Sequence, residues 1–413
     1  MSETVVIVGA GHAAGQTAAS LRQKGFSGRI IMIGDEDWVP YQRPPLSKAY
    51  LAGELDTERL FFKPEKFWPE HDIETILGVH VDAIDAAAKT LTLSNGHSVQ
   101  YDKLVLATGS RARELPIPGN ELHGVHYLRN IDDVEKIQPA FKAGARLVIV
   151  GGGYIGLEVA AVGRKKGLDV TVLETENRVM NRVVATEISD FFQQMHTHEG
   201  VKLELGRRVK EIQGDEKVTS VKCADGFSVA TDICIIGIGI IPNTEVAAAA
   251  GIKCSNGIVV DEYCQSSDPD IFAAGDCTRH PNPILGRHLR LESVHNAIEQ
   301  GKTVAASIVG TPVAYAQVPW FWSDQYNVKL QIVGITEGYD QFVIRGKPDE
   351  RSFAAFYLQN GKLLAVDAIN SPREFMLGKK LVAAGARFDI AELGDADKDF
   401  KELATAALEA AAT

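Results

Sequence analysis

The fold of this chain is decided by the stretch Val5-Val-Ile-Val-Gly9-Ala-Gly11-His-Ala-Ala14. Its opening run of β-branched residues is typical of a strand that is buried on both faces. The strand pattern breaks at Gly9, which permits a tight turn, and Gly11 leaves room for a phosphate group at the start of a helix. Ala14 stands where the third glycine of the G-x-G-x-x-G/A motif would be. The stretch therefore predicts a strand-to-helix turn that binds a dinucleotide.

The residues that follow supply the context that this motif requires. A helical pattern covers Ala13–Lys24, and a second apolar run, Arg29–Ile33, precedes Asp35 and Glu36. A carboxylate placed after the second strand of such a unit binds the ribose hydroxyls. We expect Asp35 or Glu36 to have this role.

The same unit occurs a second time. Leu147-Val-Ile-Val-Gly151-Gly-Gly153-Tyr-Ile-Gly156 again joins an apolar run to a helical pattern, and Asp169-Val-Thr-Val-Leu-Glu174 follows. One such motif is a weak signal, but two copies in full context predict two dinucleotide sites. FAD and a nicotinamide nucleotide are the economical pair, because a hydride can pass between them. Glu174 favours NADH, since its carboxylate would repel a 2′-phosphate, although Arg178 weakens this argument.

Further motifs carry a family resemblance over almost the whole chain. They are Arg43-Pro-Pro-Leu-Ser-Lys48, Ala107-Thr-Gly109, Gly151-Gly-Gly-Tyr-Ile-Gly-Leu-Glu158, Gly237-Ile-Gly239-Ile-Ile-Pro242-Asn243, Ala273-Ala-Gly-Asp276 and Trp320-Phe-Trp-Ser-Asp-Gln-Tyr326. In this set and order the chain resembles the bacterial FAD-dependent NADH:ferredoxin reductases of putidaredoxin reductase type, which serve haem-thiolate monooxygenases and aromatic-ring dioxygenases.

The motifs and the resemblance together define the expected cofactor sites. The residues expected to bind FAD are Gly9, Gly11, Ala13, Ala14, Asp35, Arg43, Lys48, Val81, Thr108, Gly109, Arg129, Asp276, Val294 and Trp320. The residues expected on the NADH side are Gly151, Gly153, Tyr154, Gly156, Glu174 and Gly239. Asp276 also follows from the pattern itself, because it ends an apolar run and its carboxylate would point into the crevice at the strand ends, unless it only caps a helix or a turn.

Lys48 and Glu158 are the expected catalytic pair. An ammonium group beside the flavin would stabilise negative charge on the reduced ring, and Glu158 would hold the lysine as its ion-pair partner. The alternative for Lys48 is an exposed helix residue. Tyr154 either packs at a helix start or stacks on a cofactor ring, and Trp320 and Trp322 are either core aromatics or neighbours of the flavin edge.

The element pattern predicts an α/β protein with two Rossmann-like domains and a C-terminal α+β domain. Because the Asp276 motif follows the second dinucleotide unit, the NAD-binding domain is expected to be inserted into the FAD-binding domain. The expected boundaries are 1–114 and 245–315 for the FAD-binding domain, 115–244 for the NAD-binding domain and 316–413 for the last domain. Short strands are predicted at 328–335, 341–345, 352–359 and 362–369, with a hairpin turn at Asn360-Gly361 and helices at 371–384 and 397–411.

The resemblance implies a reaction in which NADH gives a hydride to FAD, and electrons then pass singly to a [2Fe–2S] ferredoxin that feeds a monooxygenase or dioxygenase. An NADH oxidase and a redox-sensing flavoprotein of apoptosis-inducing-factor type remain alternatives. A disulfide reductase is disfavoured, because no cysteine precedes Cys223 and no histidine follows His295. The cysteines also form no C-x-x-C pair and match no iron–sulfur or other metal-ligand pattern.

Composition narrows the partners and the location. The formal net charge of −11 disfavours a general nucleic-acid binder. The longest apolar stretch, Ile233–Ile241, is too short to cross a membrane, and no signal peptide pattern precedes Val5, so a cytoplasmic protein is expected. Docking of a ferredoxin, itself usually acidic, would depend on apolar contact or on a local basic patch, for which Arg287, Arg290 and Lys302 are candidates.

Overall fold

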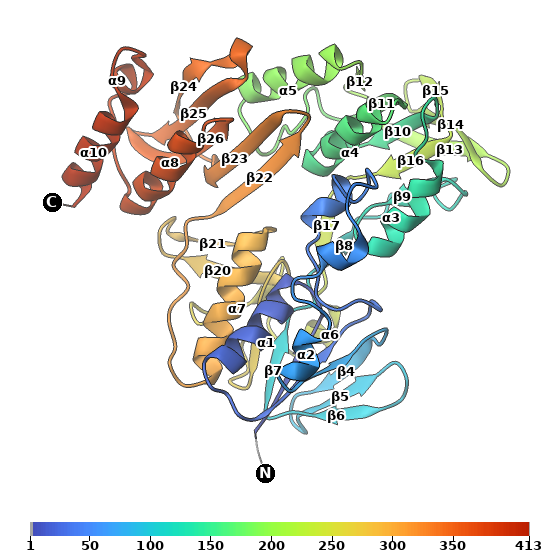
Figure 1. The fold of residues 1–413 in the computed structure, drawn as a ribbon, viewed down its shortest axis with the longest axis vertical. Coiled ribbons are helices and arrows are strands. Elements are labelled where there is room, and N and C mark those ends of the chain that lie inside the picture. Colours follow the sequence, from blue (N-terminus) through green and yellow to red (C-terminus); the bar gives the residue numbers. More distant parts are fainter. Residues whose placement is uncertain (1–2, 413) are drawn as a thin grey trace. The chain divides into compact units, whose positions relative to one another are not determined.

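The structure is a computed structural model that describes residues 3–412. Its contacts divide the chain into two compact units. The first comprises the residues up to Gln42, Thr57–Arg111 and Ile241–Phe321, and the second comprises Arg43–Asp56, Ala112–Ile240 and the residues from Trp322 onward. Each unit contains one of the two parallel sheets that the repeated motif predicts (Figure 1). The division into three domains with the boundaries given above stays a prediction.

The first unit is built on a five-stranded parallel sheet in the order β19-β7-β1-β2-β3. Its strands are β1 (Thr4–Val8), β2 (Arg29–Ile33), β3 (Ile73–Ile76), β7 (Lys103–Leu106) and β19 (Ile271–Ala273). Val5 and Ile7 of β1 face one apolar core, and Val6 and Val8 face another. The central strand is therefore buried on both faces, as its sequence predicts.

Two kinds of layer cover this sheet. Helices α1 (His12–Gln23) and α7 (Val294–Ile308) pack together on the Val5 side, where Leu21 and Val304 are fully buried. On the Val6 side, Leu91 and Leu93 bring in a three-stranded antiparallel sheet. That sheet and the unit's smaller elements are β4 (Val81–Asp85), β5 (Thr90–Leu93), β6 (Ser98–Gln100), η2 (Thr57–Leu60), α2 (Phe67–Glu70), α6 (Glu245–Ala249), β18 (Ile258–Val259), β20 (Thr278–Asn282) and β21 (Arg287–Leu289).

The second unit repeats this plan with the parallel order β12-β11-β10-β16-β9. Here Val148 and Val150 of the central strand pack against an antiparallel sheet that includes Ile212 and Val221. The elements are β9 (Val125–Tyr127), α3 (Ile131–Ile137), β10 (Arg146–Val150), α4 (Tyr154–Lys165), β11 (Asp169–Leu173), α5 (Thr186–His198), β12 (Lys202–Glu204), β13 (Val209–Gly214), β14 (Val218–Cys223), β15 (Ser228–Ala230) and β16 (Ile233–Ile236), with the 3-10 turns η1 (Pro44–Ser47) and η3 (Gln138–Ala140). The chain crosses between the two units within β8 (Ser110–Ala112), within β17 (Ile240–Pro242) and after Gln42, Asp56 and Phe321.

The C-terminal part is an α+β structure, as predicted. Its sheet has the order β22-β23-β26-β25-β24 and its described pairs are antiparallel. The strands are β22 (Trp320–Gln325), β23 (Val328–Gly334), β24 (Gln341–Lys347), β25 (Ser352–Gln359) and β26 (Lys362–Ile369), and the remaining elements are η4 (Pro348–Glu350), α8 (Pro372–Ala384), α9 (Ile390–Gly394) and α10 (Phe400–Ala411). Asn360 and Gly361 have φ values of 49° and 79°, which a two-residue hairpin turn requires. Strand β22 and helix α9 were not predicted from the sequence.

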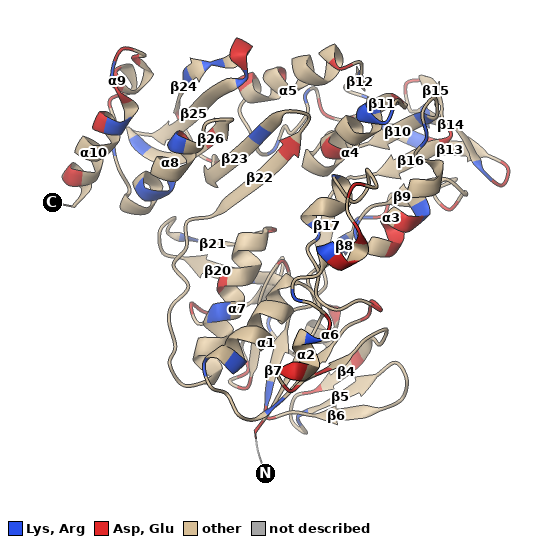
Figure 2. Cartoon of the chain, in the orientation of Figure 1, with Lys and Arg blue, Asp and Glu red and all other residues tan. Residues whose placement is uncertain are grey.

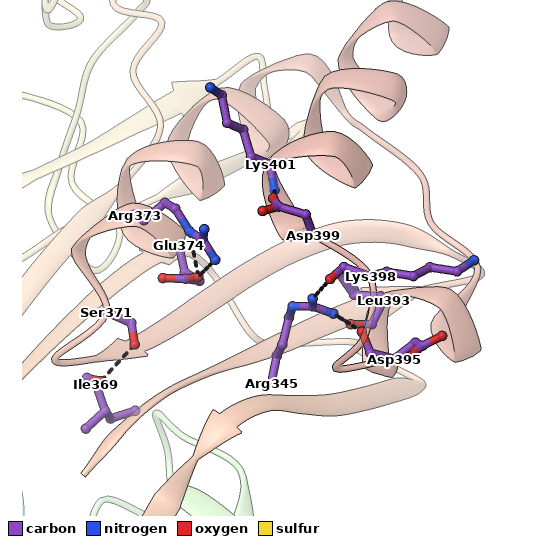
Figure 3. Close-up of polar contacts among 10 residues, drawn as sticks. All are labelled: Arg345, Ile369, Ser371, Arg373, Glu374, Leu393, Asp395, Lys398, Asp399 and Lys401. Atoms are coloured by element: carbon purple, nitrogen blue, oxygen red, sulfur yellow. Dashed lines mark hydrogen bonds and ion pairs between the residues drawn. The ribbon is translucent and has the colours of Figure 1, made fainter. Parts of the chain in front are cut away.

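Arg345 of β24 connects this sheet to the last two helices (Figure 3). Its Nη1 donates to the carbonyl oxygens of Leu393 at 2.9 Å and Asp395 at 2.6 Å, and its Nη2 donates to the carbonyl of Lys398. Asp399 then caps α10 by accepting a hydrogen bond from the Lys401 N–H at 2.6 Å. One arginine therefore satisfies one carbonyl in the last turn of α9 and two carbonyls of the segment between α9 and α10. None of the helices within residues 3–412 is long and apolar enough to cross a membrane.

Candidate functional site

Four residues predicted to bind FAD follow neighbouring strands of the first unit's parallel sheet. Gly9 follows β1, Asp35 follows β2, Thr108 follows β7 and Asp276 follows β19. Because the carboxyl ends of parallel strands lie at one edge of a sheet, the structure brings these four residues to the same edge. This is the edge at which open α/β sheets bind their ligands.

Glycine is required at the first turn of both motifs. Gly9 has a φ of +112°, and a Cβ there would lie 2.2 Å from the Ala107 carbonyl oxygen. Gly151 has a φ of +111°, and a Cβ there would lie 2.4 Å from the Gly237 carbonyl oxygen. In each unit the turn passes against the neighbouring strand's end so closely that no side chain fits.

The second glycine of each motif has open space before it. Gly11 precedes α1 and Gly153 precedes α4, and neither helix start has a side-chain cap. A Cβ at either glycine would meet no atom of the described chain within 4 Å. Each helix start therefore offers uncapped N–H groups and the positive end of the helix dipole to an anion. The residues present fit the pyrophosphate of a dinucleotide at both places.

The third motif position differs between the copies. A Cβ at Gly156 would lie 2.1 Å from the Gly151 carbonyl oxygen, so α4 comes as close to its strand as only glycine allows. In the first copy Ala14 is fully buried at this position and Ala13 is nearly so. Helix α1 therefore accommodates a methyl group where α4 does not.

Glu174 lies beside the glycine turn of the second copy. Its Oε2 accepts a hydrogen bond from the Gly152 N–H at 2.6 Å, and its Oε1 accepts one from the Glu176 N–H at 2.9 Å. Arg178, which weakened the preference for NADH, donates to the carbonyl oxygens of Val184 and Asn181, each at 2.9 Å. The carboxylate is thus held at the turn, whereas the guanidinium is bound to its own loop. Gly239 follows β16 at the same edge and has a φ of +109°.

Asn243 fixes the turn that contains Thr108 and Gly109. The Thr108 hydroxyl donates to the Asn243 carbonyl oxygen at 2.6 Å, and the Asn243 Nδ2 donates to the Thr108 carbonyl oxygen at 2.9 Å. The Asn243 N–H also donates to the Gly109 carbonyl oxygen at 3.0 Å. No role was predicted for Asn243, although its motif was noticed, because nothing local shows that residues so distant in the chain are bonded.

Asp276 is positioned by two residues that sequence reasoning missed. Ser110 donates its hydroxyl to Oδ2 of Asp276 at 3.0 Å. The fully buried Gln300 of α7 accepts hydrogen bonds through Oε1 from the Gly275 N–H at 2.8 Å and the Thr278 hydroxyl at 2.9 Å, and so holds the turn on both sides of Asp276. A glutamine on the buried face of α7, one turn from the buried Asn296, was the available signal.

Lys48 and Glu158 form the predicted ion pair. The Lys48 Nζ lies 2.6 Å from Oε2 of Glu158, with 19% and 1% of the two side chains exposed. The Ser47 hydroxyl donates to the same oxygen at 2.5 Å, and the Ser323 hydroxyl donates to Oε1 at 2.6 Å. A carboxylate buried on α4 is therefore matched by one cation and two hydroxyl donors.

Arg43 and Arg129 are also brought together, because the Arg43 Nη1 donates to the Arg129 carbonyl oxygen at 2.9 Å. These two residues and Lys48 belong to the second unit, whereas the other residues predicted for FAD belong to the first. Val81 packs its side chain into the apolar core of the first unit. Val294 opens α7, and Trp320 lies 5.3 Å from the ring of His295, between ring centroids.

Tyr154 lies near a buried acid that sequence reasoning also missed. Asp367 of β26 is fully buried, and its Oδ2 accepts a hydrogen bond from the Tyr357 hydroxyl at 2.5 Å. Burial raises the pKa of Asp367 to about 7. Burial also raises the pKa of Tyr154, with smaller contributions from the charges of Asp367 and Glu158. An aspartate inside an apolar strand was the signal that could have identified it.

Thiol and metal chemistry find no support in the described residues. All five cysteines are free, and four of them, Cys223, Cys234, Cys264 and Cys277, are buried. Burial raises the pKa of Cys234 to about 12, far from the range of a reactive thiol. Within residues 3–412 no group of three or more His, Cys, Asp or Glu side chains could hold a metal ion.

Comparison with known proteins gives a consistent result. Residues 3–301 match the family described as pyridine nucleotide-disulphide oxidoreductase, and residues 320–404 match the family described as reductase C-terminal. Among curated proteins the chain is similar to rhodocoxin reductase of Rhodococcus erythropolis, with 43% identity over 96% of this chain and 93% of the relative. It is also similar to putidaredoxin reductase of Pseudomonas putida, with 42% identity over 98% of both chains.

The solved structures show the same likeness. The chain superposes on the reductase in the crystal structure of the covalent putidaredoxin reductase–putidaredoxin complex with a TM-score of 0.95 and 42% identity, covering 98% of this chain and 99% of the other. The agreement extends over both units and the C-terminal sheet.

Proposed function

This chain belongs to the pyridine nucleotide-disulphide oxidoreductase family, and we propose that it is an NADH-dependent ferredoxin reductase. It would oxidise NADH and reduce a [2Fe–2S] ferredoxin that feeds a monooxygenase or dioxygenase. The observation that carries the proposal is the pair of uncapped helix starts at Gly11 and Gly153, each facing open space, in a chain related over its full length to ferredoxin reductases. Two such helix starts serve two dinucleotides.

We assign FAD to the first copy of the motif and NADH to the second. The first copy shares its sheet edge with Thr108, Asp276 and Asp35, which are among the residues expected to bind FAD. The second copy holds Glu174, whose carboxylate favours a free ribose hydroxyl over a 2′-phosphate. FAD, when bound, would supply the chemistry that takes up a hydride and gives electrons singly.

The chain's own residues would orient the two cofactors and stabilise negative charge on the reduced flavin. Lys48 would place a positive charge beside the flavin, and Glu158 would hold that charge in one position. Tyr154, at the first position of α4, would pack against the nicotinamide side. No side chain is needed as a general acid, because a hydride carries its own electrons.

The absence of thiol chemistry supports an external acceptor. The five cysteines are free and form no dithiol, so electrons taken from NADH have no protein disulfide to reduce. A cytoplasmic location is part of the proposal, because free thiols persist in reducing compartments.

The test is an assay of NADH-driven cytochrome c reduction with and without a panel of purified [2Fe–2S] ferredoxins. We expect turnover that depends on both NADH and at least one ferredoxin, while NADH consumption with oxygen alone stays slow. Rapid oxygen-dependent NADH consumption with no response to any ferredoxin would instead identify an oxidase.

A further inference from the structure

A chain of buried hydrogen bonds runs away from the Lys48–Glu158 pair within the second unit. Beyond Oε1 of Glu158 it passes through the Ser323 hydroxyl at 2.6 Å and Gln325 Nε2 at 3.1 Å. It continues from Gln325 Oε1 to His196 Nε2 at 2.8 Å, and ends where the Tyr326 hydroxyl lies 3.4 Å from His196 Nδ1. None of these contacts was predicted from the sequence.

Three separate segments contribute to this chain of hydrogen bonds. Glu158 is on α4, His196 is in the last turn of α5, and Ser323 and Gln325 are on β22. Ser323 and Gln325 are two positions apart, so their side chains leave the same face of the strand. All four side chains are essentially buried, with at most 1% of the residue exposed. Buried polar groups linked in this way restrict one another's orientation.

The direction of every hydrogen bond in this chain of hydrogen bonds is fixed by Glu158, the group at which it begins. Glu158 is paired with Lys48, and a carboxylate only accepts, so Ser323 must donate to it. The Ser323 oxygen then accepts from the Gln325 amide nitrogen, which leaves the Gln325 oxygen facing His196. His196 must therefore carry its hydrogen on Nε2 and accept at Nδ1. Every donor in the chain of hydrogen bonds points toward Glu158.

We propose that Ser323, Gln325 and His196 are positioning residues that fix the orientation of the Glu158 carboxylate and, through it, the place of the Lys48 ammonium. The inference deepens the proposed function, because it rests on Lys48 acting beside the flavin. It assigns a part in that site to Ser323 and Gln325, the buried polar residues of strand β22. Burial lowers the pKa of His196 to about 4, which agrees with the neutral ring that the hydrogen bonds require.

An orienting role fits this set of groups better than a proton path. The Gln325 amide interrupts the chain, and an amide does not readily take up and release protons. The Ser47 hydroxyl donates to one oxygen of Glu158, and the Ser323 hydroxyl, which belongs to the chain of hydrogen bonds, donates to the other. The carboxylate therefore cannot rotate without losing a hydrogen bond. Loss of Ser323 would free one oxygen and loosen the lysine.

The test uses the FAD-loaded protein and two matched variants. Ser323→Ala removes the donor to Glu158. Thr231→Val is the control, because it removes a hydroxyl that is as buried as that of Ser323 and lies 2.6 Å from the Ile233 carbonyl oxygen. Thr231 precedes β16, at the end of the sheet away from Gly151. Trace acetylation followed by mass spectrometry reports the reactivity of Lys48, and flavin content and melting temperature show whether each variant is folded.

We expect acetylation of Lys48 to rise several-fold in Ser323→Ala and to stay at the wild-type level in Thr231→Val. Flavin reduction by NADH in stopped-flow should slow by roughly tenfold in Ser323→Ala, less in Gln325→Met, and by under about twofold in Tyr326→Phe, whose hydrogen bond is the longest and most distant. Rescue of both readouts by Ser323→Thr, which keeps the hydroxyl, would further support the assignment.

Unchanged Lys48 reactivity in Ser323→Ala, or an equal change in Thr231→Val, would overturn the proposal. Raised reactivity with flavin reduction at the wild-type rate would overturn it as well, because the orientation of Lys48 would then not matter to the reaction. Failure of the proposed function has a different signature: wild-type protein would reduce no ferredoxin, whatever the state of Lys48.

Discussion

Glu174 is the single residue on which the expected nucleotide preference depends. Its two oxygens accept hydrogen bonds from the Gly152 and Glu176 N–H groups, so the carboxylate is fixed where an adenosine ribose would lie. We expect wild-type protein to prefer NADH. Glu174→Gln keeps an acceptor but removes the charge, and should raise kcat/KM for NADPH by about tenfold with a smaller loss for NADH, since a repulsion worth on the order of 1–2 kcal/mol disappears.

The matched control for Glu174 is Arg178→Lys, because the guanidinium is bound to the Val184 and Asn181 carbonyls. That variant should leave the ratio of kcat/KM values for the two nucleotides close to the wild-type ratio. Equal use of NADH and NADPH by the wild-type protein would contradict the assignment of Glu174.

Asp367 makes stability depend on pH in a way that can be isolated. Burial raises its pKa from 3.8 to about 7, so between these values the unfolded chain releases a proton that the folded chain keeps. The contribution of Asp367 to the free energy of unfolding therefore falls as pH rises from about 4 to 7, by at most about 1.4 kcal/mol per pH unit. Asp367→Asn retains an acceptor for Tyr357 but does not titrate.

Denaturant unfolding of wild type and Asp367→Asn at intervals from pH 4 to 8 measures this effect. The wild-type stability relative to the variant should be greatest near pH 4 to 5 and should decline toward pH 8, because ionising the buried carboxyl favours the unfolded state. A difference between the two proteins that stays constant over this range would show that Asp367 is ionised throughout.

At the scale of elements, the first glycine of each turn is required for folding, whereas the second is required for binding of the nucleotide. A Cβ at Gly151 would meet the Gly237 carbonyl oxygen at 2.4 Å in a backbone with a φ of +111°, whereas a Cβ at Gly153 would meet no described atom within 4 Å. Gly151→Ala should therefore lower the free energy of unfolding by about 2 kcal/mol or more. Gly153→Ala should keep near wild-type stability and lose NADH affinity by at least about tenfold, because its methyl group would occupy the place of the pyrophosphate.

Melting temperature measures the loss of stability, and NADH titration measures the loss of affinity. In the first copy of the motif, Gly9 corresponds to Gly151 and Gly11 corresponds to Gly153. Full NADH affinity in a folded Gly153→Ala variant would argue against a nucleotide at the start of α4.

The elements that could be predicted from the sequence are those with a continuous local pattern. Strand β2, strand β25 and strand β26 have the predicted bounds, and the Asn360-Gly361 turn is confirmed, because burial on both faces and left-handed φ values leave local marks in the sequence. Strand β22 mixes aromatic and polar residues without alternation, since its polar side chains face buried partners. Helix α9 is only five residues long, which is too short for a periodic pattern.

The same limit applies to the candidate site. The glycine turns and the terminal acids lie within single motifs, so they could be predicted from spacing, and the Lys48–Glu158 pair followed from the resemblance. The residues that hold the site in place could not be predicted. Ser323, Gln300 and Asn243 contact their hydrogen-bond partners only after folding brings distant segments together. Hydrogen bonds over such sequence separations have no periodic signal.

At the scale of the whole molecule, charge sets how an acidic partner can dock. The formal net charge is −11, and Figure 2 shows acidic and basic residues scattered along the chain. Acidic residues lie beside the basic candidates Arg290 and Lys302: Arg290 Nη1 lies 2.5 Å from Glu292 Oε1, and Lys302 Nζ lies 2.7 Å from Glu299 Oε1. Their charge is therefore partly neutralised within the chain, which favours apolar contact as the basis of docking.

This argument predicts the response of ferredoxin reduction to salt. If docking depends on apolar contact between two acidic proteins, salt screens a repulsion, and KM for ferredoxin should stay level or fall as ionic strength rises from about 0.03 to 0.3 M, over which the Debye length shrinks several-fold. A neutral quinone acceptor, assayed with the same NADH concentrations, serves as the control for salt effects on NADH binding and hydride transfer. A KM for ferredoxin that rises steeply with salt, while the quinone reaction is unchanged, would restore the basic patch as the docking site. Replacing Arg287, Arg290 and Lys302 one at a time by glutamine would then show which of the three candidates forms the patch.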